Sequence, residues 1–573
     1  SPSRGLGDVY KRQITDPEHP ADADSLLIMT FTNAAAAKLR ADITARLAQE
    51  VRAHPGNTNL RRQQLLLQRA SIGTVDAFCL HFVQQHFAML DVPPDFTTAE
   101  EADLARIEQE TLAATLETAY QDADFRAFAD LYDRGRTDST AGDAVLDLYH
   151  FTRALPHPAA SLTAFAEMWQ QEAPPQQTEW GRELLGIALA RAQGVKALLD
   201  SGAAIAARDE KADAAYTAVM LDDAARVENL CYHLEQGDWD KCLSALELVL
   251  SGWRAAGRIK GGKDANQSAA AASELRDRAK KQLEGLRRDA LLCTAEEFAA
   301  DRRRAAPLVA ALVRVTQTFA DNCFAAKCAE KVLDYADYEH LTLDLLVNER
   351  NERTPLCRTV SSRYTAVLVD EYQDTNALQD AIYFALARPE ADNLFFVGDI
   401  KQSIYRFRLA DPGIFVGKQQ QWKPHPQPAP SPATLALDAN FRSATGVIEG
   451  INYLFEVFFT QGLGGVPYGD GQRLVVGGDK SAAYQGLCEI DVIDGADTAG
   501  DAAAIARRIA EMVKTGFAVR GKEGVRPCRY EDFCILLRGR KGFADYEGAL
   551  RTAGIPVFAD SAADLLDEPH IRP

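Results

Sequence analysis

Two adjacent carboxylates, Asp370 and Glu371, follow a short apolar run at residues 366–369 and are the first candidates for chemistry. The run is rich in β-branched residues and ends abruptly in charge, which is typical of a buried parallel strand. Ligands of open α/β sheets bind at the carboxyl ends of such strands. One carboxylate there can hold Mg²⁺ on phosphate oxygens, and its neighbour can orient and deprotonate an attacking water. The alternative is a helix start at which Asp370, Glu371 and Asp374 offset the helix dipole.

A second apolar run, residues 394–397, also ends in a polar cluster. The cluster contains Gly398, Asp399, Lys401, Gln402 and Ser403. Two strands that both deliver polar groups to the carboxyl edge of a sheet are much less expected by chance than one. The pair predicts adjacent buried strands, and it indicates ATP as the ligand.

Five ordered segments resemble a known family. They are DEYQDTN at 370–376, GDIKQSIYRFRLADP at 398–412, LDANFRS at 437–443, MTFTNAAAAKLR at 29–40 and SIGTVDAFCLHFV at 71–83. In that order they resemble the Walker B element, motif III, motif IV, motif Ia and the ST(I/V)HSFC element of superfamily 1 DNA helicases of the UvrD/RecB type. The resemblance is closest to the AddA subunits of bacterial helicase–nucleases.

The resemblance implies roles in an ATP site with Mg²⁺. Asp370 would bind the metal and Glu371 would activate water, while Gln402 would sense the γ-phosphate and Arg442 would act as an arginine finger. Phe441 resembles the position that stacks on adenine. The alternatives are a strand cap for Gln402, a solvated surface arginine for Arg442 and a core phenylalanine for Phe441.

The resemblance also implies a DNA-binding surface. Its residues would be Thr30, Phe31, Thr32, Asn33, Tyr405, Phe407 and Arg408. Hydroxyl, amide and backbone N–H groups at a helix start can hold a DNA phosphate, and aromatic rings can stack on bases. Phe407 stands where many relatives have tryptophan, a mild departure because phenylalanine also stacks. The alternative for Thr32 or Asn33 is ordinary N-capping.

The family's phosphate-binding loop, G-x-x-x-x-G-K-S/T, is not found in the 573 residues. In relatives that loop lies shortly before motif Ia, so we expect the chain to begin just after it. Residues 1–13 resemble a non-native leader rather than part of the fold. We also expect the later helicase motifs and the nuclease domain to be missing, and little or no ATP turnover.

The composition is that of a large soluble protein with reduced thiols. The net charge of −19 argues mildly against nucleic acid as a partner, but basic residues are concentrated between Arg254 and Arg304. That concentration indicates either a DNA-binding groove or a solvated helix face. The ten cysteines match no metal template, and no apolar run is long enough for a membrane span. We expect a cytoplasmic protein without a membrane partner.

The predicted fold class is α/β, with RecA-like P-loop NTPase motor domains, each a parallel sheet flanked by helices, and a large all-helical insertion. Residues 14–98 and 331–422 would form the first motor domain and residues 99–330 the insertion. The proline-rich residues 423–433 would break any helix or strand and link to the second motor domain, 434–573. That domain would contain a helix at 545–553 and a strand at 555–558.

The function that the resemblance implies is ATP-dependent DNA unwinding of the 3′–5′ type in double-strand-break repair. The partners would be single- and double-stranded DNA and an AddB-like nuclease subunit in a heterodimer. Two alternatives remain open at this point. One is a catalytically inactive DNA-binding or scaffold protein, and the other is a UvrD-like repair helicase without a nuclease.

Overall fold

The computed structural model describes residues 13–14, 21–133, 140–259, 262, 266–428, 431–459, 468–469, 471–477, 488–491, 493, 497–521 and 524–559. Residues 1–12, most of the predicted leader, lie outside this set. The chain divides into two compact units, of which one ends at Thr434 and the other begins at Leu435. Each unit is described by itself.

The first unit contains a four-stranded parallel sheet in the order β2-β1-β5-β6. The strands are β1 (Leu26–Thr30), β2 (Ser71–Thr74), β5 (Ala366–Val369) and β6 (Leu394–Phe396). Every residue of β1 and β5 is buried, as their continuous apolar sequences predict. β6 differs from the prediction of a buried strand, because it forms the sheet edge and exposes Phe395.

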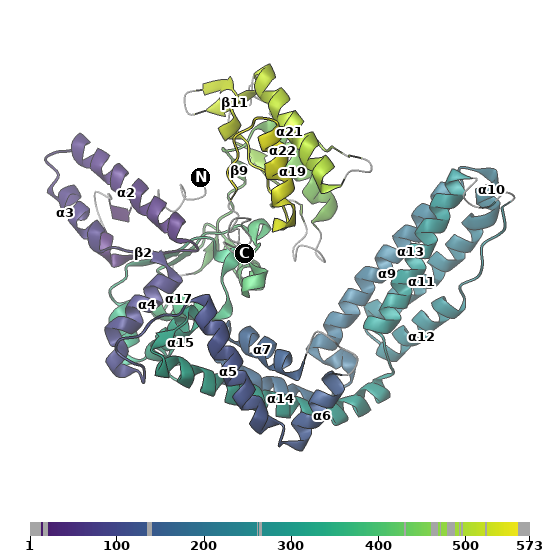
Figure 1. Ribbon diagram of the computed structural model, residues 1–573, viewed down its shortest axis with the longest axis horizontal. Helices are drawn as coiled ribbons and strands as arrows, with labels where there is room; N and C mark the ends of the chain where they lie inside the picture. The colour runs from purple at the N-terminus through teal and green to yellow at the C-terminus, as the bar shows by residue number, and fades with distance from the viewer. Residues whose placement is uncertain are drawn as a thin grey trace, which may run out of the picture. The chain divides into compact units, whose positions relative to one another are not determined.

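Side chains alternate along β1, so its two faces enter two different cores. Leu26 and Ile28 pack against α2 (Asn33–Ala53) and α3 (Thr58–Leu66) on one side of the sheet. Leu27 and Met29 face the opposite side. There the sheet packs against α4 (Val75–His86), α15 (Tyr335–Leu346), α16 (Pro355–Ser361) and α17 (Ala377–Leu386). Figure 1 shows α2 and α3 on one side of β2, and α4, α15 and α17 on the other. This layered α/β fold confirms the predicted class.

The helical insertion lies between two paired strands, β3 (Thr97–Thr98) and β4 (Val332–Leu333), which run parallel. Its first core joins four helices: α5 (Glu101–Ala119), α6 (Ala123–Tyr132), α7 (Ala141–Thr152) and the long α14 (Ala295–Ala329). α8 (Pro158–Gln170) packs on α14. The insertion therefore starts and ends at one place beside the α/β core.

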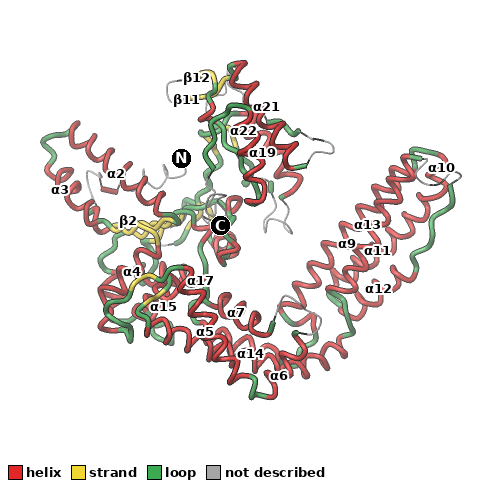
Figure 2. The backbone as a smooth tube through the Cα atoms, viewed as in Figure 1, coloured by secondary structure: helices red, strands yellow, loops and turns green. Residues whose placement is uncertain are grey.

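A second helical core lies further along the insertion. It is formed by α9 (Glu179–Ala206), α11 (Ala218–Gln236), α12 (Trp239–Ser251) and α13 (Gln267–Asp289). Figure 2 shows these helices running side by side. Among the described residues, no helix is both long enough and apolar enough to cross a bilayer.

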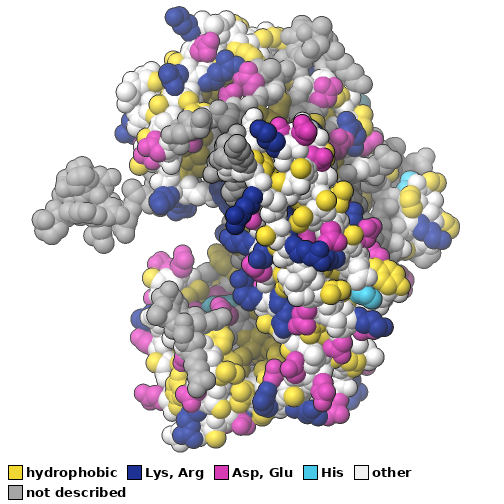
Figure 3. All heavy atoms as spheres, turned by 90° about the vertical axis from the view of Figure 1, so that its right-hand side faces the viewer, with side chains coloured by type: hydrophobic (Ala, Val, Ile, Leu, Met, Phe, Trp, Pro, Cys, Tyr) yellow, Lys and Arg dark blue, Asp and Glu magenta, His cyan; other side chains and the backbone are white. Residues whose placement is uncertain are grey.

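About half of the described basic residues between Arg254 and Arg304 contact acceptors inside the helical insertion. Arg276 is buried, and its Nε donates to Asp223 Oδ2 at 2.8 Å. Further ion pairs join Arg287 to Glu247, Arg288 to Asp289 and Arg304 to Asp301. On the face turned to the viewer in Figure 3, basic and acidic side chains are interspersed. This pairing favours a charge-balanced helical surface over a basic groove; Lys260 and Lys263 lie outside the described residues.

In the second unit, the described helices are α19 (Thr445–Phe458), α21 (Thr498–Thr515) and α22 (Phe543–Thr552). Short strands β9 (Ala439–Asn440) and β10 (Val475–Val476) pair in parallel, and β11 (Ala518–Gly521) pairs with β12 (Gly524–Pro527) as a hairpin. The strand predicted at residues 555–558 is not observed, because that described segment pairs with no other strand.

The proline-rich segment also departs from its prediction. β7 (Lys423–Pro424) pairs with β8 (Ala433–Thr434), although this stretch was expected to break any strand. Each strand has only two residues, and proline lacks the N–H that a longer ladder would need. The prolines therefore limit the length of the pairing rather than prevent it.

Candidate nucleotide and DNA site

The carboxyl ends of β1, β2, β5 and β6 meet at one edge of the sheet, and this edge carries the predicted site. The N–H of Asp370 donates to the carbonyl of Met29 at 2.9 Å, so the ladder continues to the first carboxylate. A cavity of about 250 Å³ opens at this edge. Its walls include Thr30, Phe31, Asp370 and Glu371. The structure therefore brings the predicted Walker B carboxylates beside the predicted motif Ia residues.

Asp370 is buried at the end of β5. Burial raises the pKa of its carboxyl, and the charge of Glu371 raises it further, to about 6. A nearby cation would offset both effects and favour the ionised form. Oxygen ligands of this kind suit Mg²⁺, so the donor chemistry at Asp370 fits the predicted metal. Its role as the metal ligand stays a prediction.

Glu371 adopts a left-handed backbone conformation, with φ of 51°. A residue other than glycine in this region carries strain of roughly 1–3 kcal/mol and is found disproportionately at functional sites. Its carboxylate Oε2 accepts a hydrogen bond from Gln373 Nε2 at 2.9 Å. The backbone turn and this hydrogen bond fix the direction of the predicted water-activating carboxylate.

Gln402 lies in the turn after β6, where Asp399 organises the polar cluster. Asp399 Oδ2 accepts from Gln402 Nε2 at 2.9 Å, and its Oδ1 lies 2.8 Å from Lys401 Nζ. Gln402 itself is exposed. The predicted phosphate sensor is thus held by a carboxylate on its own turn, and its amide can exchange this partner for a phosphate oxygen.

Phe441 and Arg442 belong to the other compact unit. The Phe441 side chain is 70% exposed, so the alternative of a core phenylalanine is wrong. Its ring lies over Gly477, where an added Cβ would come within 2.9 Å of the ring. The N–H of Arg442 donates to Asn440 Oδ1 at 2.9 Å, and the side chain is exposed. Their parts in the ATP site stay predictions.

An aromatic surface lies beside the cavity. The ring of Phe31, which follows β1, is 4.3 Å from the ring of Tyr405 between centroids, and Tyr405 is 5.8 Å from Phe407. The Arg408 guanidinium lies within 6 Å of both the Tyr405 and Phe407 rings. Phe407 is 76% exposed. Residues predicted from two distant motifs thus form one aromatic surface with a cation, and base stacking on it stays a prediction.

Thr30 is the last residue of β1, and Thr32 and Asn33 lie at the start of α2. Thr32 is the N-cap, and its Oγ1 accepts from the N–H of Ala35 at 3.1 Å. Thr30 is buried and donates from Oγ1 to the carbonyl of Thr32 at 3.1 Å. Thr32 and Asn33 are exposed. The N-capping alternative is therefore observed for Thr32, and phosphate binding by this helix start stays a prediction.

One wall of the cavity went unrecognised in the sequence. It is formed by Asp76 at the start of α4, Glu339 in α15 and Gln379 in α17. Gln379 Nε2 donates to Glu339 Oε1 at 2.8 Å. Burial raises the pKa of Glu339, and the charge of Asp76 raises it further, to about 8. No short-range pattern in the sequence marks Asp76 and Glu339 as a pair, because they come from segments far apart in the chain.

The raised pKa of Glu339 beside Asp76 predicts that the stability of the fold falls as pH rises. Glu339→Gln should remove this pH dependence. The folded chain keeps the Glu339 proton up to about pH 8, whereas the unfolded chain releases it near about pH 4.3. The folded state binds more protons in this window, so stability falls as pH rises through it, by up to about 1.4 kcal/mol per pH unit. Glutamine does not titrate, so the decline should be shallower, as urea unfolding at several pH values would measure. An unchanged slope would contradict the raised pKa of Glu339.

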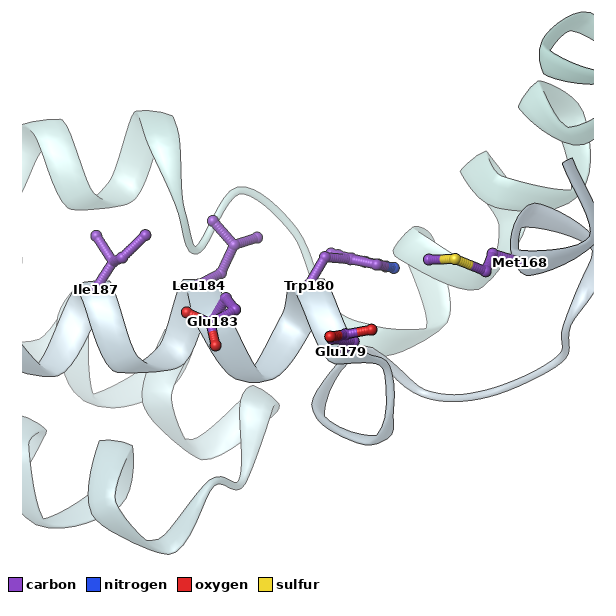
Figure 4. A pocket seen from close by; sticks show the side chains of 6 residues that line it. All are labelled: Met168, Glu179, Trp180, Glu183, Leu184 and Ile187. Atoms are coloured by element: carbon purple, nitrogen blue, oxygen red, sulfur yellow. The ribbon is translucent and has the colours of Figure 1, made fainter. Parts of the chain in front are cut away.

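A second hollow, of about 510 Å³, lies in the helical insertion. Figure 4 shows Trp180, Leu184 and Ile187 projecting from α9 beside Met168 of α8. Glu179 and Glu183 complete its lining. These six residues include no cation that could bind phosphate.

The parallel sheet with helices on both faces forms a RecA-like core, and the edge of this sheet carries the paired carboxylates and the turn with Gln402. The UvrD/REP helicase N-terminal domain family matches residues 11–423, and the chain belongs to that family.

Comparison with known proteins gives several relatives, each named as the A subunit of an ATP-dependent helicase/nuclease. The chain is 32% identical to the one from Pelotomaculum thermopropionicum, over 99% of this chain and 49% of the relative. It is 32% identical to that of Bacillus velezensis, over 96% and 46%, and 29% identical to that of Ruminiclostridium cellulolyticum, over 98% and 49%. The chain therefore spans about half the length of these relatives.

Proposed function

We propose that the protein is the helicase subunit of an AddAB-type helicase–nuclease, an ATP-dependent DNA helicase of the 3′–5′ type acting in double-strand-break repair and recombination. One observation carries the proposal. Asp370 and Glu371 end β5, and the turn after the adjacent strand β6 carries both Gln402 and the aromatic residues Tyr405 and Phe407. Nucleotide-type and DNA-type groups thus share one edge of one sheet. Family membership and the names of the relatives support this assignment.

In the proposed reaction, Asp370 would hold Mg²⁺, which neutralises phosphate charge when bound. Glu371 would orient the attacking water and accept its proton, and Gln402 would donate its amide to the γ-phosphate. Arg442 and Phe441 would contribute from the second unit, as arginine finger and adenine stack. Phe31, Tyr405 and Phe407 would hold successive bases of single-stranded DNA. The proposed partners are DNA and an AddB-like nuclease subunit, in the cytoplasm.

The 573-residue chain is expected to bind single-stranded DNA but to hydrolyse ATP only at background rate. The reason is that its sequence contains no G-x-x-x-x-G-K-S/T, whose lysine and hydroxyl bind the phosphates and Mg²⁺. A coupled assay of ATP turnover, with and without a thymidine oligomer, measures this. Hydrolysis that DNA stimulates and Glu371→Gln abolishes would contradict the expected inactivity. Failure to bind DNA at all would contradict the helicase assignment.

Two other functions remain as candidates. One is a DNA-binding scaffold without catalysis, but a scaffold has no chemical need for Asp370, Glu371 and Gln402 together. A UvrD-like repair helicase without nuclease would share every feature of the described site. Co-purification with a nuclease subunit from the same operon would support the proposed function over a UvrD-like helicase without nuclease.

A further inference from the structure

We propose that Gln373 is a positioning residue that links the carboxylate of Glu371 to the turn that carries the DNA-stacking residues. DNA bound on that turn would then change the orientation of the Glu371 carboxylate. The inference rests on the proposed function and deepens it, because it names how the DNA surface would regulate the nucleotide site.

The Gln373 side chain joins the ends of two strands. It is 1% exposed, although it lies beside an open cavity. Its Nε2 donates to Glu371 Oε2 at 2.9 Å and to Asp374 Oδ2 at 3.2 Å. Its Oε1 accepts from the N–H of Asp399, in the turn after β6, at 2.9 Å. Both amide hydrogens and the carbonyl oxygen are used, so this glutamine cannot turn without breaking hydrogen bonds on both strands.

The close approach of the two strand ends requires glycine at position 398. A Cβ on Gly398 would lie 2.6 Å from Gln373 Oε1 and 3.2 Å from the Gln373 backbone nitrogen. On the same turn, Ser403 Oγ donates to the Gln373 carbonyl at 3.4 Å. The turn is thus held to Gln373 through both its side chain and its backbone, and a shift of the turn must move Gln373.

The far end of the turn contacts the same cluster. Burial and the charge of Glu371 raise the pKa of Asp374 to about 6, while the backbone N–H groups of Ile404 and Tyr405 lower it. Asp374 lines the cavity together with Phe31, Glu371 and Arg408. Gln373 is the donor shared by Asp374 and Glu371, so a shift of the turn that follows base stacking on Tyr405 would reach both carboxylates through this one side chain.

The strained backbone of Glu371 makes this coupling effective. A left-handed glutamate has a lower-energy alternative conformation, and the hydrogen bond from Gln373 opposes its release. Weakening that bond should let Glu371 relax away from the cavity. The Glu371 carboxylate would therefore have two states, one held by Gln373 and one relaxed away from the cavity. The position of the turn would shift the equilibrium between them.

Hydrogen–deuterium exchange on the full chain tests the coupling without requiring ATP turnover. A thymidine oligomer is added to the unchanged chain, to Gln373→Leu and to a matched control, Gln63→Leu. Gln63 is also buried and fully bonded, accepting from the N–H of Ala23 at 2.8 Å and donating to Asp22 and Asn59 at 3.2 Å. It lies away from the cavity, so its loss costs similar hydrogen bonds without touching the strand ends.

In the unchanged chain and in Gln63→Leu, DNA is expected to slow exchange both in peptides covering 399–408 and in peptides covering 371–376, the latter about tenfold. In Gln373→Leu, DNA should still slow exchange at 399–408, with no change at 371–376. If Gln373→Leu does not fold, Gln373→Glu replaces it, because it keeps the acceptor for Asp399 while placing a carboxylate against Glu371 and Asp374.

The outcomes separate the coupling from the proposed function. Protection of 371–376 that persists in the Gln373 variant overturns the coupling and leaves DNA binding intact. If DNA protects 399–408 but not 371–376 in the unchanged chain, the coupling is also overturned and DNA binding is left intact. If DNA protects neither segment of the unchanged chain, the proposed DNA site itself is wrong and the coupling falls with it.

Discussion

Replacing Lys327 with methionine is expected to lower the free energy of unfolding by about 3–5 kcal/mol, because it removes one partner of a buried ionic cluster. Lys327 is 1% exposed at the end of α14, and its Nζ lies 2.6 Å from Asp337 and 2.9 Å from Asp334. Arg153 of α7's C-cap also contacts both carboxylates. Methionine fills a similar volume but leaves the buried Asp337 and the partly buried Asp334 with a single cation.

Urea unfolding followed by circular dichroism measures this loss, with Lys196→Met as the control. Lys196 forms an exposed pair with Asp200 at 3.0 Å, four residues apart on α9, and such pairs contribute about 0.3–0.5 kcal/mol. Equal effects of the two substitutions would show that the Lys327 cluster does not stabilise the junction between the insertion and the motor core.

The same cluster gives an acid-side pH dependence with a defined sign. Burial raises the pKa of Asp334, but the charges of Arg153 and Lys327 outweigh it and bring the pKa to about 2. A lowered pKa contributes stability that is present above the ordinary value and lost as pH falls through the folded value. The loss should therefore occur between about pH 4 and pH 2 and amount to about 2 kcal/mol.

Phe407→Ala is expected to weaken binding of single-stranded DNA by about 5- to 150-fold, the effect of losing one base–aromatic stack worth about 1–3 kcal/mol. The ring is largely exposed and lies beside Tyr405 and Arg408, so its removal should change stability by less than about 0.5 kcal/mol. Fluorescence anisotropy with a labelled thymidine oligomer, at one fixed salt concentration, measures the affinity.

Phe151→Ala provides the matched control for this substitution. Phe151 is an exposed phenylalanine of the same unit, on α7, outside the aromatic surface. Its loss should leave the affinity unchanged. A comparable loss of affinity in both variants would indicate nonspecific binding, and no loss in Phe407→Ala would remove this residue from the DNA surface.

The strands and the strand-end residues were predictable because their signals are local. Residues 26–30 and 366–369 are continuous apolar runs followed by polar side chains, and this pattern alone places Asp370 at the carboxyl edge. The proximity of Phe31 and Tyr405 was predictable only through the family resemblance. Their segments are far apart in the chain, and no periodicity connects them.

The features that escaped prediction depend on tertiary neighbours. The carboxyl pair of Asp76 and Glu339 becomes distinctive only when α4 and α15 pack together. Arg276 reads as part of a basic run, but it is buried by its partner Asp223 from another helix. The edge position of β6 could not be read from its apolar sequence, because the number of strands beyond it is not encoded locally.

Because β3 pairs with β4, the helical insertion is connected to the motor core through two neighbouring chain segments. Thr97 lies opposite Val332 and Thr98 opposite Leu333, so the two chain crossings are neighbours in space. The helical insertion between β3 and β4 can therefore change in length without altering the register of the strands in the motor core. Because β3 and β4 run parallel, a connection from Thr98 must lead the chain back to the start of β4 at Val332, which a tight turn cannot do. A crossover linker of about a dozen residues or more should give a minimal motor core, provided that Asp334 and Asp337 are neutralised in the same design, since Lys327 and Arg153 leave with the insertion.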